Sequence, residues 1–174
     1  RAEYRLLLRQ DNADLRLTRI GYEVGLIDEE RYQNLLRKEK MIDAEIERVD
    51  HTNIGTSEKV QKVLKSFGST PLNSGTTLAE LIRRPELSYD KLAEIDEKRP
   101  ELPYDVEEQV NINIKYDGYI RRQMRQVEQF KKLENKKIPD DINYDDIQSL
   151  RIEAKQKLNA IRPASIGQAS RISG

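Results

Sequence analysis

The sequence predicts a mainly α-helical protein, and three observations carry that prediction. Apolar residues recur at intervals of three and four over long stretches, which is the spacing of one helix face. Ser, Thr and Asp stand just before several of these stretches, where they can cap a helix, and Gly or Pro follows. The 174-residue chain is 36% charged, with two Phe and no Trp, which suits solvated helices that each bury one apolar stripe.

The first elements have clear boundary signals. Residues 4–8 form a short apolar run, which favours a strand. Thr18 can cap a short helix that Gly25 ends, and the spacing of Gly21 and Gly25 favours close helix packing. Asp28 can then begin a long helix. The apolar residues of that helix are Leu35, Leu36, Ile42, Ile46 and Val49.

Three shorter helices are expected before a stiff connector that contains Pro100 and Pro103. Each has a hydroxyl residue at its start and a natural stop at its end. The expected start and stop residues are, in order, Ser57 and Gly68, Thr77 and Pro85, and Ser88 and Lys98.

The stretch from Asp105 to Pro139 is compatible with a strand or with a long helix. Every second residue from Val110 to Tyr116 is apolar or aromatic, which is typical of a strand. Asp105 and Glu108, however, resemble a capping box, and the apolar residues share one side of a helix. We therefore predict one helix of about 30 residues, on the order of 45 Å long. Its apolar positions are Val106, Val110, Ile114, Ile120, Met124 and Val127.

Two more helices are expected after this one. Pro163 suits the first turn of the last, short helix. The helix before it is indicated by apolar residues at helical spacing, which are Leu150, Ala154, Leu158 and Ile161.

Composition argues against most kinds of catalytic site. The chain has no Cys, which excludes a disulfide, a thiol nucleophile or a Cys-ligated metal within it. Its single His, His51, cannot alone form a zinc site or a His-based triad, and we expect it in a surface loop. Asp140 and Asp141 fit no calcium loop and are interpreted as a solvated turn. No glycine-rich loop and no bilayer-length apolar run is present, so no catalytic, cofactor, metal or membrane-spanning residues are assigned.

Basic residues are the stronger signal. The net charge is zero, but the charges occur in blocks, and the long helix carries cations opposite its apolar stripe. Gly118 lies among them, where a missing side chain would admit a phosphate, and the ring of Tyr119 could stack on an unpaired base. Alternatively, the cations fill a solvent face and Gly118 kinks the helix or seats a neighbour. The cations are Lys115, Arg122, Arg125 and Lys136.

Three long segments carry a resemblance to a known family. The chain opens on RAEYRLLLRQDNADLRLT, closes on IRPASIGQASRISG, and contains VNINIKYDGYIRRQ between them. These segments resemble the MnmG (GidA) family of FAD-dependent tRNA uridine 5-carboxymethylaminomethyl modification enzymes. The resemblance runs from end to end, is weakest over residues 49–105, and matches the C-terminal part of the family. We therefore expect a piece of a longer protein.

The resemblance implies a region that binds tRNA and a partner. The parent enzyme is expected to work in the cytoplasm as a homodimer, with the GTPase MnmE, and to add a carboxymethylaminomethyl or aminomethyl group at carbon 5 of the wobble uridine. FAD and NADH are implied for the full-length protein, and no cofactor for this piece. Residues 1–27 would be a strand remnant and linker from the upstream FAD domain, residues 28–104 a helical subdomain, and residues 105–174 a C-terminal helical subdomain cut at its end. The resemblance also favours RNA contact on the long helix.

Both ends add candidates. Arg1, Arg5 and Arg9 would share one face of a strand, and the resemblance implies that this face is turned toward the substrate. Their internal alternative is pairing with Glu3, Asp11 and Asp14. The closing segment loosely resembles half of a helix-turn-helix. Its candidate partner-binding residues are Arg162, Gln168 and Arg171.

Two other classes of function remain open. A stand-alone helical interaction module would bind proteins and not RNA, although Pro and Gly interrupt the apolar repeats that an extended coiled coil needs. A self-sufficient enzyme is disfavoured because no nucleophile–base pair or cofactor loop is found.

Overall fold

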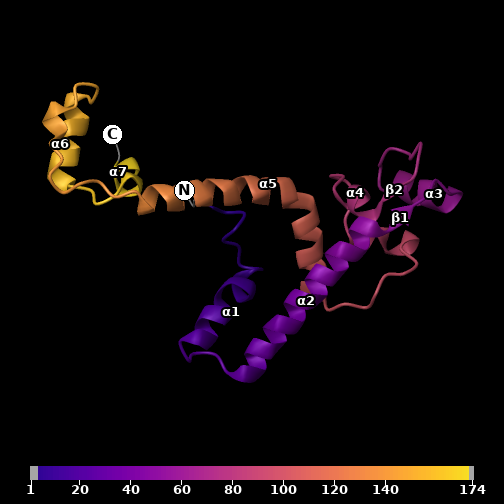
Figure 1. The fold of residues 1–174 in the computed structure, drawn as a ribbon. Coiled ribbons are helices and arrows are strands. Elements are labelled where there is room, and N and C mark those ends of the chain that lie inside the picture. Colours follow the sequence, from indigo (N-terminus) through magenta and orange to yellow (C-terminus); the bar gives the residue numbers. More distant parts are fainter. Residues whose placement is uncertain (1–3, 173–174) are drawn as a thin grey trace. The chain divides into compact units, whose positions relative to one another are not determined.

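The computed structural model describes residues 4–172 and is mainly helical, as predicted (Figure 1). It forms two compact units, Arg1–Ile120 and Arg121–Gly174, and helix α5 begins in the first and continues into the second. In chain order the elements are α1 (Ala13–Glu23), α2 (Glu29–His51), β1 (Asn53–Ile54), α3 (Glu58–Ser66), β2 (Thr76–Thr77), α4 (Leu78–Ile82), the 3-10 helix η1 (Asp90–Ile95), α5 (Tyr104–Asn135), the 3-10 helix η2 (Tyr144–Asp146), α6 (Ile152–Ile161) and α7 (Ile166–Ser170).

The core of the first unit is built from apolar faces of α2, α3, α4, η1 and the start of α5. Fully buried side chains include Val49, Leu64, Ile82, Leu92 and Val110. Burying each such side chain contributes roughly 1.5–3 kcal/mol, so this cluster dominates the stability of the unit. The short antiparallel pair β1–β2, with Ile54 opposite Thr76, joins the end of α2 to the start of α4.

Several predicted helix boundaries are confirmed. The side chains of Asp28, Ser57 and Thr77 accept hydrogen bonds from backbone N–H groups in the first turns of α2, α3 and α4. These bonds satisfy donors that a helix N-terminus otherwise leaves free. Gly25 and Gly68 follow the ends of α1 and α3 with φ of +77° and +70°, a conformation that glycine adopts without steric cost.

The predicted strand at residues 4–8 is wrong. This segment is a turn, in which the N–H groups of Leu7 and Leu8 both donate to the carbonyl oxygen of Tyr4 at 2.9 Å. The first helix is also longer than predicted, because it begins at Ala13 and encloses Thr18, which is buried within it and caps nothing. A local apolar run therefore gave the wrong element where a turn is stabilised by distant contacts.

Other boundaries need smaller corrections. The helix expected from Ser88 to Lys98 is the shorter 3-10 helix η1. The last helix begins at Ile166, capped by Ser165, so Pro163 precedes it and does not occupy its first turn. His51 is the exposed last residue of α2, although the sequence indicated a loop.

The segment from Asp105, which was compatible with a strand or a long helix, forms a helix as predicted. Helix α5 spans 32 residues and buries Val106, Val110 and Ile114, which recur every four positions. The capping box of Asp105 and Glu108 is not formed, because the helix starts one residue before Asp105 and the carbonyl oxygen of Pro103 accepts its first backbone hydrogen bond at 2.9 Å. Packing periodicity thus outweighed the strand-like alternation.

A buried charge cluster joins α2 to η1 and its flanks. The guanidinium of Arg48 donates to Glu45 and to Asp96, each at 2.9 Å, and the Tyr89 hydroxyl donates to Glu45 at 2.7 Å. Glu45, Asp96 and Tyr89 are all buried. The two carboxylates raise the pKa of Arg48, and burial together with the Glu45 hydrogen bond raises the pKa of Tyr89. Each buried charge is therefore compensated.

The second unit closes around the end of α5. Ile138 N–H donates to Ala164 O at 3.0 Å, and Ile166 N–H donates to Lys136 O at 2.9 Å. Gly167 sits so close to α5 that an added Cβ would lie 2.8 Å from the backbone nitrogen of Glu134. These contacts dock α7 against the last turn of α5 and the residues that follow it.

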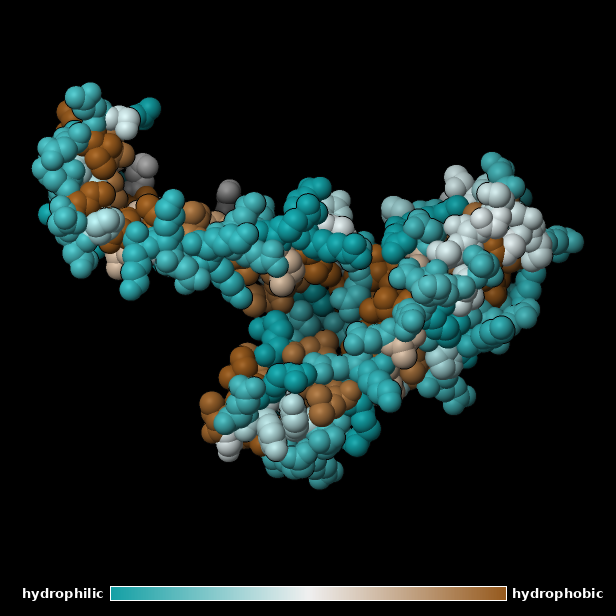
Figure 2. Space-filling model, in the orientation of Figure 1, coloured by the Kyte–Doolittle hydropathy of each residue, from teal (hydrophilic) through white to brown (hydrophobic). Residues whose placement is uncertain are grey.

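Not all apolar surface is covered. Leu17, Ile20, Val24 and Leu26 lie on or just after α1 and expose more than half of their surface. Brown apolar side chains are visible at that end of the first unit in the space-filling view (Figure 2). No helix within residues 4–172 combines the length and the apolar character that a bilayer span requires.

Candidate functional site

The candidate interface begins with exposed cations on α5. Arg122 and Arg125 lie three positions apart on the helix, and both side chains are exposed. Among residues 4–172, neither makes an ion pair or a side-chain hydrogen bond with another residue. Their charges are thus available to an external anion such as a phosphate.

Lys115 differs from these arginines. Its ammonium donates to the backbone carbonyl oxygens of Arg84 at 3.2 Å and Pro85 at 3.3 Å, just after α4. Burial, followed by repulsion from Lys91, lowers the pKa of Lys115. Lys115 therefore satisfies two backbone carbonyls that follow α4. A helical wheel of α5 alone could not show this contact.

Gly118 and Tyr119 are both open to solvent. A Cβ added at Gly118 would meet nothing within 4 Å in the described structure, and Tyr119 is 60% exposed. The described residues thus supply no neighbour that Gly118 seats. A mid-helix glycine costs roughly 1 kcal/mol of helix stability relative to alanine. Packing within the described structure does not explain why glycine occupies this position.

Lys136 lies outside the helix on which the sequence placed it. Helix α5 ends at Asn135, and the carbonyl of Lys136 instead pairs with the N–H of Ile166. Its side chain remains exposed. The wheel position of Lys136 therefore does not apply, while its charge stays accessible.

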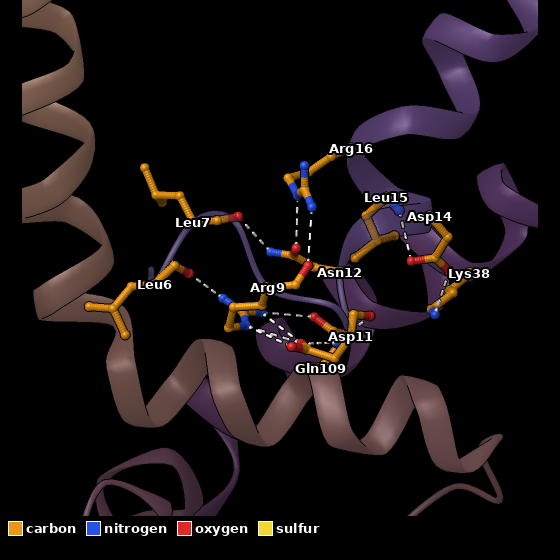
Figure 3. A network of polar contacts seen from close by, with 10 residues as sticks. All are labelled: Leu6, Leu7, Arg9, Asp11, Asn12, Asp14, Leu15, Arg16, Lys38 and Gln109. Atoms are coloured by element: carbon orange, nitrogen blue, oxygen red, sulfur yellow. Dashed lines mark hydrogen bonds and ion pairs between the residues drawn. The ribbon is translucent and has the colours of Figure 1, made fainter. Parts of the chain in front are cut away.

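The N-terminal arginines do not share a strand face. Arg1 lies outside the described residues, and Arg5 is exposed. Figure 3 shows Arg9 inside a polar network, where its Nε lies 3.1 Å from a carboxylate oxygen of Asp11 and its Nη2 donates to the side chain of Gln109 at 3.3 Å. The internal acid Asp11, not an external anion, thus neutralises Arg9.

The three candidates in the closing segment make contacts within the second unit. Arg162 donates to Ile142 O at 2.8 Å, and Gln168 accepts from the N–H of Ala164 at 2.8 Å. Arg171 forms an ion pair with Glu134 on α5. All three residues are exposed, so each could also be reached by a partner.

The acidic and histidine candidates support no metal centre. Asp140 and Asp141 are exposed in a turn, as predicted. The ring Nδ1 of His51 lies 2.8 Å from the carbonyl oxygen of Glu47 in its own helix. Among the residues that the structure describes, no three His, Cys, Asp or Glu side chains gather as metal ligands would.

Sequence reasoning missed a hollow of about 560 Å³ in the first unit, between α1, α2 and the start of α5. Its basic lining residues come from one half of α2 and are Arg31, Arg37, Lys38 and Lys40. The four cations are visible in the sequence of that half of α2. The sequence does not give the position of α1, and that position determines on which side of α2 the hollow lies.

Comparisons with known proteins agree on one family. A family model described as the tRNA modifying enzyme MnmG/GidA C-terminal helical domain matches residues 29–124, and one described as the C-terminal helical bundle of the same enzyme matches residues 126–174. The tRNA uridine 5-carboxymethylaminomethyl modification enzymes MnmG of Lachnoclostridium phytofermentans and Caldicellulosiruptor saccharolyticus are 64% and 63% identical over all 174 residues. The chain spans 28% of the length of each of these relatives.

Solved structures give the same result. The structure of Aquifex aeolicus GidA in its form II crystal is similar over 100% of this chain and 26% of its own, with a TM-score of 0.72 and 35% identity. The form I crystal gives a TM-score of 0.67 and 36% identity. The chain therefore belongs to the MnmG/GidA family and corresponds to its C-terminal helical region.

Proposed function

We propose that this chain is the tRNA- and partner-binding C-terminal region of an FAD-dependent enzyme. That enzyme, with the GTPase MnmE, adds a carboxymethylaminomethyl or aminomethyl group at carbon 5 of the tRNA wobble uridine. The observation that carries the proposal is the pair Arg122 and Arg125, two exposed cations without an internal acidic partner in the described residues, on a chain of a tRNA-modifying family.

RNA contact on α5 follows from elementary electrostatics. Planar guanidinium groups bind phosphate oxygens in a bidentate manner, and exposed arginines do so without first breaking an internal ion pair. Gly118 leaves room for a backbone to approach the helix, and Tyr119 offers an exposed ring for stacking. Lys136 adds accessible charge, as does Arg5 in the N-terminal turn. Lys115 and Arg9 have internal partners, so we assign them a supporting structural role.

The flavin and nicotinamide belong, in this proposal, to the remainder of the enzyme. Dinucleotide sites use a glycine-rich turn between a strand and a helix. The described residues do not fit that requirement, because β1 and β2 are two residues long and the passage from β2 into α4 contains no glycine. No chemical step is therefore assigned to side chains of this chain.

Partner binding is assigned to the closing segment. Arg171 is the best single test, since its side chain is exposed and its only described partner is Glu134. Arg171→Ala should weaken binding of the full-length protein to MnmE, measured by titration calorimetry. The matched control is Arg151→Ala, which removes an exposed arginine elsewhere in the second unit. Equal affinities for the two variants would remove Arg171 from the interface.

The second candidate function is a helical protein–protein interaction module without RNA binding. The observation in its favour is the apolar surface of Leu17, Ile20, Val24 and Leu26. Exposed apolar patches of this kind mark protein interfaces more readily than RNA interfaces. A chain that associates with proteins but shows no tRNA affinity at low salt would establish this alternative.

The decisive experiment is a fluorescence-anisotropy titration of the 174-residue chain with tRNA at several salt concentrations. Arg122→Glu combined with Arg125→Glu should weaken binding strongly at low salt and flatten the dependence of log affinity on log salt by about 1.5 units. The control changes Lys59 and Lys62 to Glu, two exposed cations on α3 with the same three-residue spacing, of which Lys62 pairs with Glu58 at the surface. If both double variants bound alike, α5 would be excluded as the RNA-binding surface.

A further inference from the structure

The hollow between α1, α2 and α5 has the dimensions of a binding site. Its volume of about 560 Å³ lies within the roughly 300–1,000 Å³ typical of ligand clefts. Leu35, Met41 and Val106 provide an apolar lining, and the polar residues of α2 surround it. The feature that requires explanation is the sign of the charges that line it.

The charged residues in the first half of α2 differ in whether they line the hollow. From residue 29 to residue 41 the helix carries four cations and three carboxylates. All four cations line the hollow, and none of the three carboxylates does; these are Glu29, Glu30 and Glu39. A solvated face that only needed charge would mix both signs. The charged residues that α2 contributes to the lining are therefore all positive.

One of the four cations is already neutralised. The ammonium of Lys38 lies 2.8 Å from a carboxylate oxygen of Asp14 and 2.7 Å from one of Asp105. Burial opposes its charge, but the two carboxylates outweigh burial and raise the pKa of Lys38. Asp14 and Asp105 are the two acidic residues that line the hollow. Both carboxylates of the hollow are therefore paired with Lys38.

The other three cations have no acidic partner. Within residues 4–172, Arg31, Arg37 and Lys40 form no ion pair, and Arg37 donates only to the neutral side chain of Asn34. Four cations against two carboxylates leave the hollow net positive. Arg31 precedes Arg37 by six helical residues, about 9 Å along the axis, and Lys40 follows three residues later, so the cations are spaced along the length of the helix beside the hollow.

We propose that this hollow binds backbone phosphate of RNA, with Arg31, Arg37 and Lys40 as the anion-binding groups. The inference rests on the proposed RNA binding and adds a second contact, made by residues other than those of the α5 surface. Guanidinium groups match phosphate geometry, and cations spaced along the length of a helix suit a chain of phosphates better than they suit one compact anion. The apolar lining gives the sugar between two phosphates a surface to contact.

The test compares two matched double variants of the 174-residue chain. One carries Arg37→Glu and Lys40→Glu; the other carries Lys59→Glu and Lys62→Glu on α3, outside the hollow. Both exchange two exposed cations, three residues apart, for two carboxylates, so both change net charge equally. Anisotropy titrations with tRNA at several salt concentrations give the affinity and the salt slope. Circular dichroism melting on the same preparations verifies the fold.

The expected result is at least a ten-fold loss of affinity at low salt for the α2 variant relative to the α3 variant. Its salt slope should also be flatter by about 1.5 units, because two phosphate contacts no longer release counterions. A neutral variant, Arg37→Gln with Lys40→Gln, should show an intermediate loss even if the Glu substitutions disturb folding. Equal affinities and slopes for the α2 and α3 variants would overturn this inference alone. Absence of tRNA binding by the wild-type chain would instead overturn the proposed function.

Discussion

Gln109 on α5 donates its side-chain amide to the carboxylate of Asp11 at 2.7 Å, although the two residues are 98 positions apart. Gln109 is 1% exposed, and its Nε2 also lies 3.1 Å from the backbone oxygen of Asp11. The bonds attach the turn before α1 to the buried start of α5, as Figure 3 shows. A single buried amide thus fixes the N-terminal segment on the first unit.

Gln109→Leu should destabilise the first unit by about 1–3 kcal/mol, because the partly buried Asp11 carboxylate keeps Arg9 but loses its donor from Gln109, and leucine offers no replacement. Thermal or urea unfolding followed by circular dichroism measures the change. Gln123→Leu is the informative contrast, since the side-chain oxygen of Gln123 is buried without a hydrogen-bond partner in the described structure. That substitution should be neutral or stabilising. Similar losses for both variants would show that shape, and not hydrogen bonding, explains Gln109.

The same contact predicts a dependence of stability on pH. Burial tends to raise the pKa of Asp11, but hydrogen bonds from Gln109 and Arg9 outweigh it and lower the pKa below its ordinary 3.8. A carboxyl with a lowered folded-state pKa stabilises the fold above its unfolded-state value, and this stabilisation is lost as pH falls through the folded-state value. The difference in unfolding free energy between wild type and Asp11→Asn should therefore be largest above about pH 5 and shrink in acid. A constant difference from pH 6 to pH 3 would contradict this assignment.

These long-range contacts explain which elements the sequence could predict. Asp28, Ser57 and Thr77 cap helices through N–H groups three residues away, so their role is visible locally. The turn at residues 4–8 depends on Arg9, whose Nη1 donates to Leu6 O, and on Gln109, which is a hundred residues distant. An apolar run contains no information about either contact. The strand prediction failed for that reason.

The candidate site divides in the same way. A helical wheel places residues on a face of one helix, and it correctly left Arg122 and Arg125 on an exposed face of α5. It cannot show what another element brings to that face, such as the carbonyls of Arg84 and Pro85 that Lys115 contacts. Nor can it show that α5 ends before Lys136. The exposure of these cations was predictable from the helical periodicity of the sequence. Whether each cation is free to bind a ligand was not predictable, because that depends on contacts with other elements.

The buried ion cluster should be costly to break from the cationic side. Arg48→Met leaves Glu45 and Asp96 buried without a counter-charge, and we expect a loss of about 3–5 kcal/mol in unfolding free energy. Arg83→Met is the control, because Arg83 pairs with Glu80 and Asp50 at the surface, where such pairs contribute at most about 1 kcal/mol. Denaturant titrations of both variants measure the two losses. Equal losses would show that burial of the Arg48 cluster has no energetic consequence.

Gly167→Ala should destabilise the second unit. An added Cβ would lie 2.6 Å from the side chain of Glu134 and 2.8 Å from its backbone nitrogen. The side chain can move aside, but the helix backbone cannot, so α7 must shift at a cost of roughly 1–3 kcal/mol. Hydrogen exchange should then show faster exchange at the N–H of Ile166, which donates to Lys136. Arg151→Ala, at an exposed residue elsewhere in the second unit, provides a control, and protection at Ile166 in that variant should not change.

Gly118→Ala should have opposite effects on stability and on RNA binding. Gly118 lies inside α5 with open space around its Cα, so alanine should raise the unfolding free energy by up to about 1 kcal/mol through helix propensity alone. If a phosphate approaches the backbone at this position, the new methyl group keeps it away, and tRNA affinity should fall several-fold while the melting temperature rises. Anisotropy and melting measured on one preparation test both effects. Gly55→Ala, at a loop glycine with equally open surroundings, should leave tRNA affinity unchanged. A stabilised Gly118→Ala variant with unaltered tRNA affinity would show that RNA does not approach α5 at this glycine, because helix propensity changes without any cost to binding.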